Sequence, residues 1–215
     1  SAMKPMTNYK RATGYLDKIF KLLNDEYFDG QLPKVVITIQ STPKASGHFT
    51  CYDAWHCQDE GFHEINIGAG TLDRPIENVT ATLLHEMVHE YCFLHGIKDT
   101  SRAGTYHNKR FKQEAEQRGL CIDYDSRIGF SITSPSEKLL DFCIENSLTD
   151  IQIGRNDAQS FYRGGVPGGK SATGIQRTGG SNYRRYICPV CGNIARTPKD
   201  MLLICGSCAE AMILS

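Results

Sequence analysis

His85-Glu86-Met87-Val88-His89 lies inside a largely apolar segment, residues 79–94. On a helix, histidines four residues apart lie one turn apart on the same side, so both imidazoles can bind one ion. The glutamate after the first histidine projects at a neighbouring angle, where it can accept a proton from water at the ion without binding the ion. This is the His-Glu-x-x-His arrangement of zinc peptidases. It predicts zinc ligands at His85 and His89 and a general base at Glu86.

The alternative explanation is a chance match, because His and Glu are both common on helix surfaces. The neighbouring residues are apolar, however, which predicts a buried helix. They are Leu83, Leu84, Met87, Val88, Tyr91 and Cys92. Buried imidazole and carboxylate groups need partners to offset their desolvation. A bound cation would supply a partner to all three polar residues, so the sequence favours a metal site.

Two histidines compete to be the third ligand that a catalytic zinc requires. His95 has the spacing from His89 found in peptidases that turn the chain at a glycine, but Cys92 stands where that glycine would be. If the helix continues, His95 lies too far along the axis to share the ion. His107 follows a loop that contains Gly, Thr and Ser, and the chain can fold back there. We therefore expect His107 to complete the site and His95 to lie near the helix C-terminus, where the helix dipole favours it.

Two Cys-x-x-Cys pairs, thirteen residues apart, predict a second metal site. The pairs are Cys188 with Cys191 and Cys205 with Cys208. Each pair offers two thiolates, and four thiolates complete a closed tetrahedral zinc site with no room for substrate. One Cys-x-x-Cys pair is also typical of redox centres, but two matched pairs favour a structural zinc. A unit this small is expected to fold only with its metal.

The charge of the chain is uneven, although the net formal charge is zero. From Ser160 onward there are seven Lys or Arg and two acidic residues, which leaves 17 basic and 22 acidic residues before it. A basic tail favours an anionic partner, while a solvated linker explains the same charges. Arg184 and Arg185 stand between Tyr183 and Tyr186, so they are the candidate nucleic-acid contacts. Zinc ribbons also serve as structural caps, and both interpretations stand.

The cysteines predict the compartment. Their number, nine, is odd, and four have metal-binding spacing, which indicates a reducing compartment rather than a disulfide framework. We expect Cys92, Cys121 and Cys143 in the core, and Cys51 and Cys57 as core or loop thiols. No apolar stretch is long enough for a membrane span, and no secretory signal is evident. The expected location is therefore cytoplasmic, or nucleoid or nuclear if DNA is a partner, and not secreted.

Periodicity predicts helices and short strands in alternation. The expected helices cover residues 9–28, residues from Pro75 through the zinc motif, 108–118, and a helix to about Asn146 that Ser134-Pro135-Ser136-Glu137 opens with Ser134 as its cap. The expected strands are residues 35–39, 48–52 and 64–67, and a polar loop with Trp55 and His56 joins the last two.

The composition divides the chain into three parts. Seven glycines between Arg163 and Ser181 predict a flexible linker. We expect a metallopeptidase domain over residues 4–160, a Gly-rich basic linker over 161–182, and a zinc ribbon over 183–215. At 215 residues the chain is long enough for one well-packed domain and such an appendage.

Several of these features together resemble the SprT-like zinc metallopeptidases, a family that includes the DNA-dependent protease Spartan. They are Leu32-Pro33 after Tyr27-Phe28-Asp29-Gly30, the strand Val35 to Ile39, Gly47, the His85 to His89 motif, and His107 four residues before Phe111. The resemblance covers roughly residues 9–120 and extends to the ribbon. It implies an α+β, zincin-like fold, in which helices pack on a small mixed sheet whose edge strand can receive an extended peptide. It also implies zinc at His85, His89 and His107.

The sequence therefore predicts a zinc-dependent endopeptidase with one catalytic and one structural zinc. Its expected partner is a protein or peptide substrate, DNA is a further candidate, and no membrane is expected. The rival hypothesis is a nucleic-acid-binding or adaptor protein with a quiescent or self-cleaving peptidase site. Loss of cleavage of a denatured protein substrate in Glu86→Gln, with zinc retained, would favour the enzyme.

Overall fold

The computed structural model describes residues 7–41, 45–155, 184–197 and 199–214. In chain order the elements are α1 (Tyr9–Phe28), β1 (Val36–Gln40), β2 (Gly47–Phe49), β3 (Trp55–Cys57), β4 (Glu60–Phe62), β5 (Glu64–Gly68), a 3-10 turn η1 (Ala69–Thr71), α2 (Ile76–Leu94), β6 (Thr100–Ser101), β7 (Tyr106–His107), α3 (Lys109–Gln117), β8 (Leu120–Asp125), β9 (Gly129–Pro135), α4 (Glu137–Glu145), β10 (Arg184–Ile187), β11 (Ile194–Thr197) and β12 (Ile213–Leu214). This confirms the predicted α+β class. The predicted linker, 161–182, lies outside the described residues, so the domain boundaries stay predictions.

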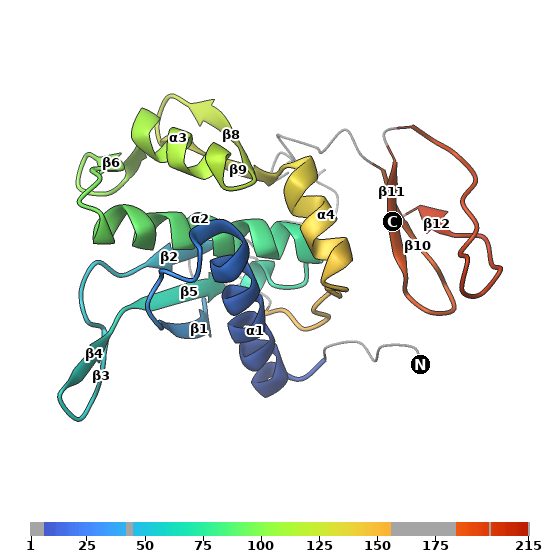
Figure 1. Cartoon of the computed structure of the whole chain (residues 1–215), viewed down its shortest axis with the longest axis horizontal. Helices are drawn as coiled ribbons and strands as arrows, with labels where there is room; N and C mark the ends of the chain where they lie inside the picture. Colours follow the sequence, from blue (N-terminus) through green and yellow to red (C-terminus); the bar gives the residue numbers. More distant parts are fainter. Residues whose placement is uncertain (1–6, 42–44, 156–183, 198, 215) are drawn as a thin grey trace, which may run out of the picture.

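Helix α2 lies in the middle of the body, between sheet β1–β5–β2 and the group formed by α3, β8 and β9 (Figure 1). Its buried residues occupy nearly every direction around the axis. They are Ile76, Glu77, Val79, Thr80, Ala81, Leu83, Leu84, His85, Glu86, Met87, Val88, Glu90 and Cys92. A helix that is buried all round is a core helix, so its polar side chains are held by packing. No helix among the described residues has the length and hydropathy to cross a membrane.

The sheet beside α2 is mixed, as predicted. Strand β5 pairs parallel with β1 and antiparallel with β2, which leaves β2 at one edge. Strand β2 is shorter than the expected 48–52, because Thr50 uses its Oγ1 to accept the N–H of Glu64 at 2.8 Å. The prediction of a polar loop before β5 was wrong. It contains the hairpin β3–β4, which projects from the body with Trp55 paired to Phe62 (Figure 1).

Two further predictions fail at the hairpin β8–β9, a feature that the periodicity did not indicate. Ser134 is not a helix cap, because it pairs with Cys121 in this hairpin. Ser136 caps α4 instead, and its side chain accepts the N–H of Leu139 at 3.3 Å. Cys121 is exposed rather than in the core, because it lies on the outer face of an alternating strand. The predictions of buried cysteines at 92 and 143 are confirmed.

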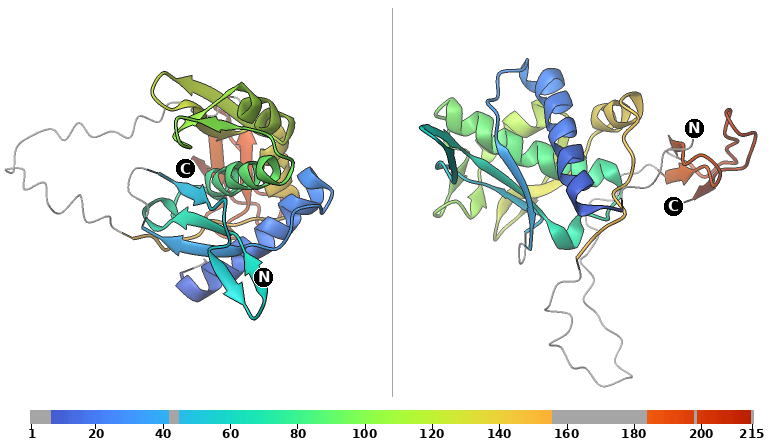
Figure 2. Two further views of the ribbon diagram at one scale, coloured as in Figure 1. Left: turned by 90° about the vertical axis from the view of Figure 1, so that its left-hand side faces the viewer. Right: turned by 90° about the horizontal axis from the view of Figure 1, so that it is seen from below.

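The ribbon forms a small unit beside the body, and its sheet has the order β11–β10–β12 (Figure 2). Two of its arginines contact the first turn of α2. Arg185 Nε lies 3.6 Å from Glu77 Oε1, and the Arg196 guanidinium also binds the Glu77 carboxylate. Arg185 Nη2 lies 2.5 Å from Asp150 Oδ2, while Asp150 Oδ1 accepts the N–H of Ile76 at 2.9 Å. A balanced, largely buried group of charges therefore joins ribbon and helix.

Replacement of Glu77 by Gln should release the ribbon from the body. The change leaves the guanidiniums of Arg185 and Arg196 short of one negative charge, and breaking a buried ion pair costs about 3–5 kcal/mol. We expect faster amide hydrogen exchange in β10, β11 and the first turn of α2. As a control, Glu116→Gln removes an exposed pair with Lys112, where the loss should stay below about 1 kcal/mol. Unchanged protection of β10 in Glu77→Gln would contradict this account of docking.

Candidate metal centre

Three imidazoles, two from α2 and one from the short strand β7, meet on one side of α2. The Nε2 atoms of His85 and His89 are 3.2 Å apart, His85 and His107 are 3.2 Å apart, and His89 and His107 are 2.9 Å apart. Nitrogens bound tetrahedrally to zinc at 2.0–2.1 Å lie about 3.3 Å from one another. The three atoms therefore have nearly the spacing that one zinc ion requires. His107 lies eighteen positions after His89 in the sequence, and folding brings the two side chains together.

Hydrogen bonds at Nδ1 of His85 and His89 place the ring proton on that atom, which leaves Nε2 of each ring as an electron-pair donor. His89 Nδ1 lies 2.5 Å from the Asp99 carboxylate, so it carries the proton of that ring. His85 Nδ1 lies 2.7 Å from Thr133 Oγ1, which itself donates to the Ser131 carbonyl at 3.3 Å and so accepts from the ring. With these two protons outside, the Nε2 lone pairs of His85 and His89 face each other and the Nε2 of His107. A cation is the partner that such a set requires.

Burial keeps these histidines in the form that binds metal. Desolvation, followed by repulsion from the neighbouring imidazoles, lowers the pKa of His85 well below its ordinary value. The same causes lower the pKa of His107 to about 4. The ring of Phe111 packs against all three imidazoles, with centroids at 4.5, 4.6 and 4.7 Å. Neutral, immobile imidazoles are the ligand form for zinc.

Glu86 lies in the same cleft, which has a volume of about 590 Å³. The cleft is lined by Ala45, Ser46, Gly47, His48, Phe49, Cys51, Arg74, Thr82, His85, Glu86, His89, Phe93, Ile97, Asp99, Thr100, Gly104, Thr105, His107, Ile128, Ser131 and Thr133. Burial raises the pKa of Glu86 to about 7, and the nearby His89 opposes this rise. The carboxyl group therefore sits beside the metal position in surroundings that favour proton exchange near neutral pH.

Gly47 allows strand β2 to approach α2 at this point. A Cβ atom at Gly47 would lie 2.9 Å from the Asn66 carbonyl oxygen, 3.1 Å from Glu86 Oε1 and 3.2 Å from Thr82 Cγ2. Any larger residue would push the strand away from the carboxylate or turn the carboxylate aside. The glycine thus sets the width of the cleft at Glu86.

The four ribbon cysteines form the second group. The Sγ atoms of Cys188, Cys191, Cys205 and Cys208 all lie within 4.8 Å of one another. Cys191 and Cys205 are 3.5 Å apart, close to the roughly 3.8 Å between sulfurs on a tetrahedral zinc. The left-handed backbone of Gly192, φ 73°, closes the first turn. Backbone N–H groups, first that of Ser207, lower the pKa of Cys205 and favour its thiolate.

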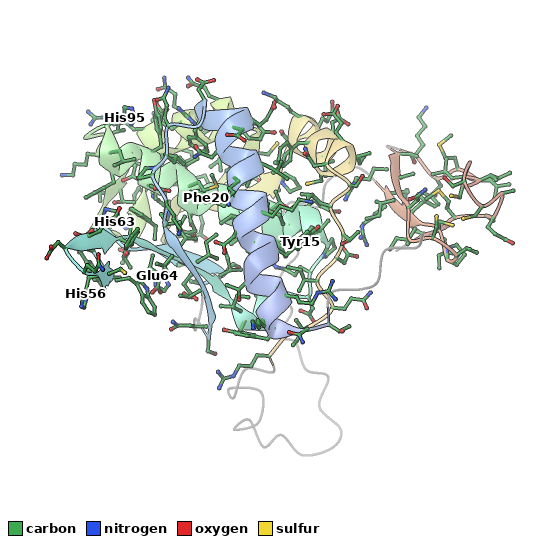
Figure 3. All side chains as sticks on the ribbon, turned by 60° about the horizontal axis from the view of Figure 1, so that its bottom comes forward. Tyr15, Phe20, His56, His63, Glu64 and His95 are labelled. Atoms are coloured by element: carbon green, nitrogen blue, oxygen red, sulfur yellow. The ribbon has the colours of Figure 1, made fainter. Side chains whose placement is uncertain are left out.

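The remaining predicted residues lie elsewhere. His95, labelled in Figure 3, is the C-cap of α2. Its Nδ1 donates to the Tyr91 carbonyl at 2.9 Å and its ring stacks on that of Tyr91, so it does not belong to the group of His85, His89 and His107. Arg184 is exposed and pairs with Asp200 at 2.7 Å. Arg185 is buried against Glu77 and Asp150, so in this arrangement it does not face solvent. That Arg184 and Arg185 contact nucleic acid stays a prediction.

Sequence reasoning missed the groups that orient the ligands. Asp99 and Thr133 belong to no motif, and Thr133 lies 48 residues from the histidine that it contacts. Asp99 is ten residues from His89, in a segment expected only to be irregular. A polar residue in a loop beside a metal motif is a weak signal, because its partner depends on how the loop folds.

The comparison with known families agrees with this geometry. The model of the SprT-like family matches residues 16–128, just over half of the 215-residue chain. The matched segment includes all three histidines and Glu86. No curated protein matches the chain.

Two zinc ions per chain are expected in purified protein by elemental analysis. His107→Ala should remove the ion of the histidine site, and Cys205→Ser should remove the ribbon ion, because each loses one ligand of its set. The two variants should therefore each contain one zinc. A wild-type content of one zinc, or loss of both ions in Cys205→Ser, would contradict two independent sites.

Asp99→Asn should weaken the histidine site without removing a ligand. The amide cannot accept the His89 proton as strongly, and loss of such an outer partner typically lowers metal affinity about 10- to 100-fold. Competition with a chromophoric zinc chelator measures the change. Asp123→Asn, on the exposed face of β8, is the matched control and should retain wild-type affinity; an equal loss in both variants would refute the role of Asp99.

Proposed function

The chain belongs to the SprT-like family, and on this basis we propose that it is a zinc-dependent endopeptidase acting on protein substrates. The family supports a metallopeptidase-like domain. The proposal of endopeptidase activity goes further, and one observation carries it. Three imidazole nitrogens at zinc spacing, a buried glutamate and the edge of a sheet share a single cleft.

The edge strand offers a place for an extended peptide. Ser46 accepts from Gly68 and Thr50 donates to Glu64, so these residues bond to β5. Because antiparallel pairing alternates, the backbone groups of Gly47 and Phe49 point to the open side of β2. A peptide can add there as a further strand through main-chain hydrogen bonds, which do not depend on its sequence. Such a peptide would pass Glu86, which lies beside Gly47.

The residues divide the work of hydrolysis. When bound at His85, His89 and His107, zinc would supply Lewis acidity that polarises a carbonyl and acidifies water. Glu86 would take the proton of the attacking water at a carboxylate oxygen and deliver it to the leaving amine. Its burial keeps bulk water from competing for that proton. The pairing with β2 would hold the scissile bond in place, which lowers the entropy cost of the reaction.

The rival function, a nucleic-acid-binding adaptor, has less support. Of its two candidate contacts, Arg185 is occupied by Glu77 and Asp150, and Arg184 is next to Asp200. DNA remains a candidate partner, and adding it to the protease assay separates the two functions.

Glu86→Gln should abolish cleavage of a denatured protein substrate, with a rate loss of at least about 100-fold, and should keep both zinc ions. The substitution preserves size but removes the base. Glu60→Gln, on the exposed hairpin, serves as the control and should cleave at the wild-type rate. Assays with single- and double-stranded DNA at several salt concentrations test for a DNA requirement. If wild type cleaves nothing under any of these conditions, the endopeptidase proposal fails.

A further inference from the structure

Arg74 lies at one end of the cleft and is held there rigidly. It follows η1, just before α2, and lines the cleft together with Thr82 and Glu86. Its Nε donates to the Thr71 carbonyl at 2.7 Å, and its Nη2 donates to Thr82 Oγ1 at 2.9 Å. Thr82 in turn donates to the Asn78 carbonyl at 3.0 Å. The guanidinium is therefore fixed in one orientation by backbone and helix.

The charge of Arg74 has no counter-ion among the described residues. No carboxylate of those residues lies within 4.0 Å of the guanidinium, and two of its five N–H donors account for the hydrogen bonds described above. Burial lowers the pKa of Arg74, and the exposed Asp73 opposes this only through space. A partly buried, unpaired cation is costly, and an anion in the cleft would offset that cost.

The direction of the cleft shows which part of a peptide would meet Arg74. Gly47, the first residue of β2, lies against Thr82 and Glu86, whereas the Phe49 ring contacts Phe93 near the end of α2, at 6.1 Å. An extended peptide antiparallel to β2 would thus enter over the aromatic end and leave toward Arg74. Thr82 precedes Glu86 by one helical turn, roughly 6 Å. At about 3.3 Å per residue, this distance corresponds to roughly two residues beyond the scissile bond.

We propose that Arg74 forms a carboxylate-binding subsite, which selects an acidic group about two residues after the scissile bond. This inference rests on the proposed function. The carboxylate can belong to a Glu or Asp side chain or to the C-terminus of a short peptide, since both present the same two oxygens to a guanidinium. The fixed Nε and Nη2 bonds leave the other N–H groups to bind them. Arg74 is thus a specificity residue rather than a catalytic one.

Cleavage profiling of a proteome-derived peptide library by mass spectrometry tests the subsite. Wild type should favour Glu or Asp over Gln or Asn at the first three positions after the cleaved bond, by roughly 10- to 100-fold. Arg74→Gln should bring that ratio to about one, and Arg74→Lys should keep part of it because it retains the charge. Arg11→Gln, exposed on α1, is the charge-matched control and should keep the full ratio. An unchanged ratio in Arg74→Gln overturns the proposal.

A binding experiment separates failure of the subsite from failure of the proposed function. A random peptide library displayed on phage is selected on zinc-loaded Glu86→Gln, and on the same protein with Arg74→Gln added. Enrichment of acidic residues only in the first selection supports the subsite even if no cleavage is ever seen; equal enrichment in both overturns it. Synthetic peptides with free or amidated C-termini then show whether the terminal carboxylate or an acidic side chain is bound. Melting temperatures confirm that each variant is folded.

Discussion

The whole arrangement depends on the burial of a helix that carries charged and polar groups. Packing on every side makes α2 immobile, but it also desolvates His85, Glu86 and Glu77. Partners from other elements offset this cost for the histidines and for Glu77. Asp99 and Thr133 hold the histidine rings from the side of β6 and β9, and the ribbon arginines hold Glu77. The fold around α2 therefore supplies partners to His85, His89 and Glu77 on this buried helix.

The same burial explains why sheet and helix stand so close at the cleft. Asn66 is fully buried on β5, and its side-chain oxygen accepts the N–H of Gln40 on β1. Its backbone carbonyl limits how far any side chain at position 47 can extend. Gly47 lets the edge strand reach Glu86, while Phe49 and Phe93 close the far end with aromatic contacts. The cleft therefore has a polar end at Glu86 and an aromatic end at Phe49 and Phe93. If a peptide binds there as proposed, this asymmetry would give it a preferred direction.

The sequence predicted the parts of this protein that depend on local spacing. His85, Glu86 and His89 follow from helical geometry, and the rejection of His95 follows from helix length, since α2 does run to Leu94. The order of α1, β1, β5 and α2 also followed from periodicity. What failed depended on tertiary context. Ser134 has the composition of a helix cap, but its backbone is used by β8, and short strands such as β3 and β6 carry too few residues to show a period.

The basic residues of the ribbon show most clearly what composition alone cannot predict. Counted along the chain, Arg185 and Arg196 belong to a basic tail that favours an anionic partner. In the fold, the anion is Glu77 of the same chain. One guanidinium cannot bind this carboxylate and a phosphate in the same geometry, so nucleic acid could reach Arg185 only if the ribbon left the first turn of α2. Because α2 is a continuous helix and His85 lies about two turns beyond Glu77, such a movement would begin at the helix that carries His85 and His89. Helix α2 thus carries both the ribbon contact at Glu77 and the metal ligands His85 and His89.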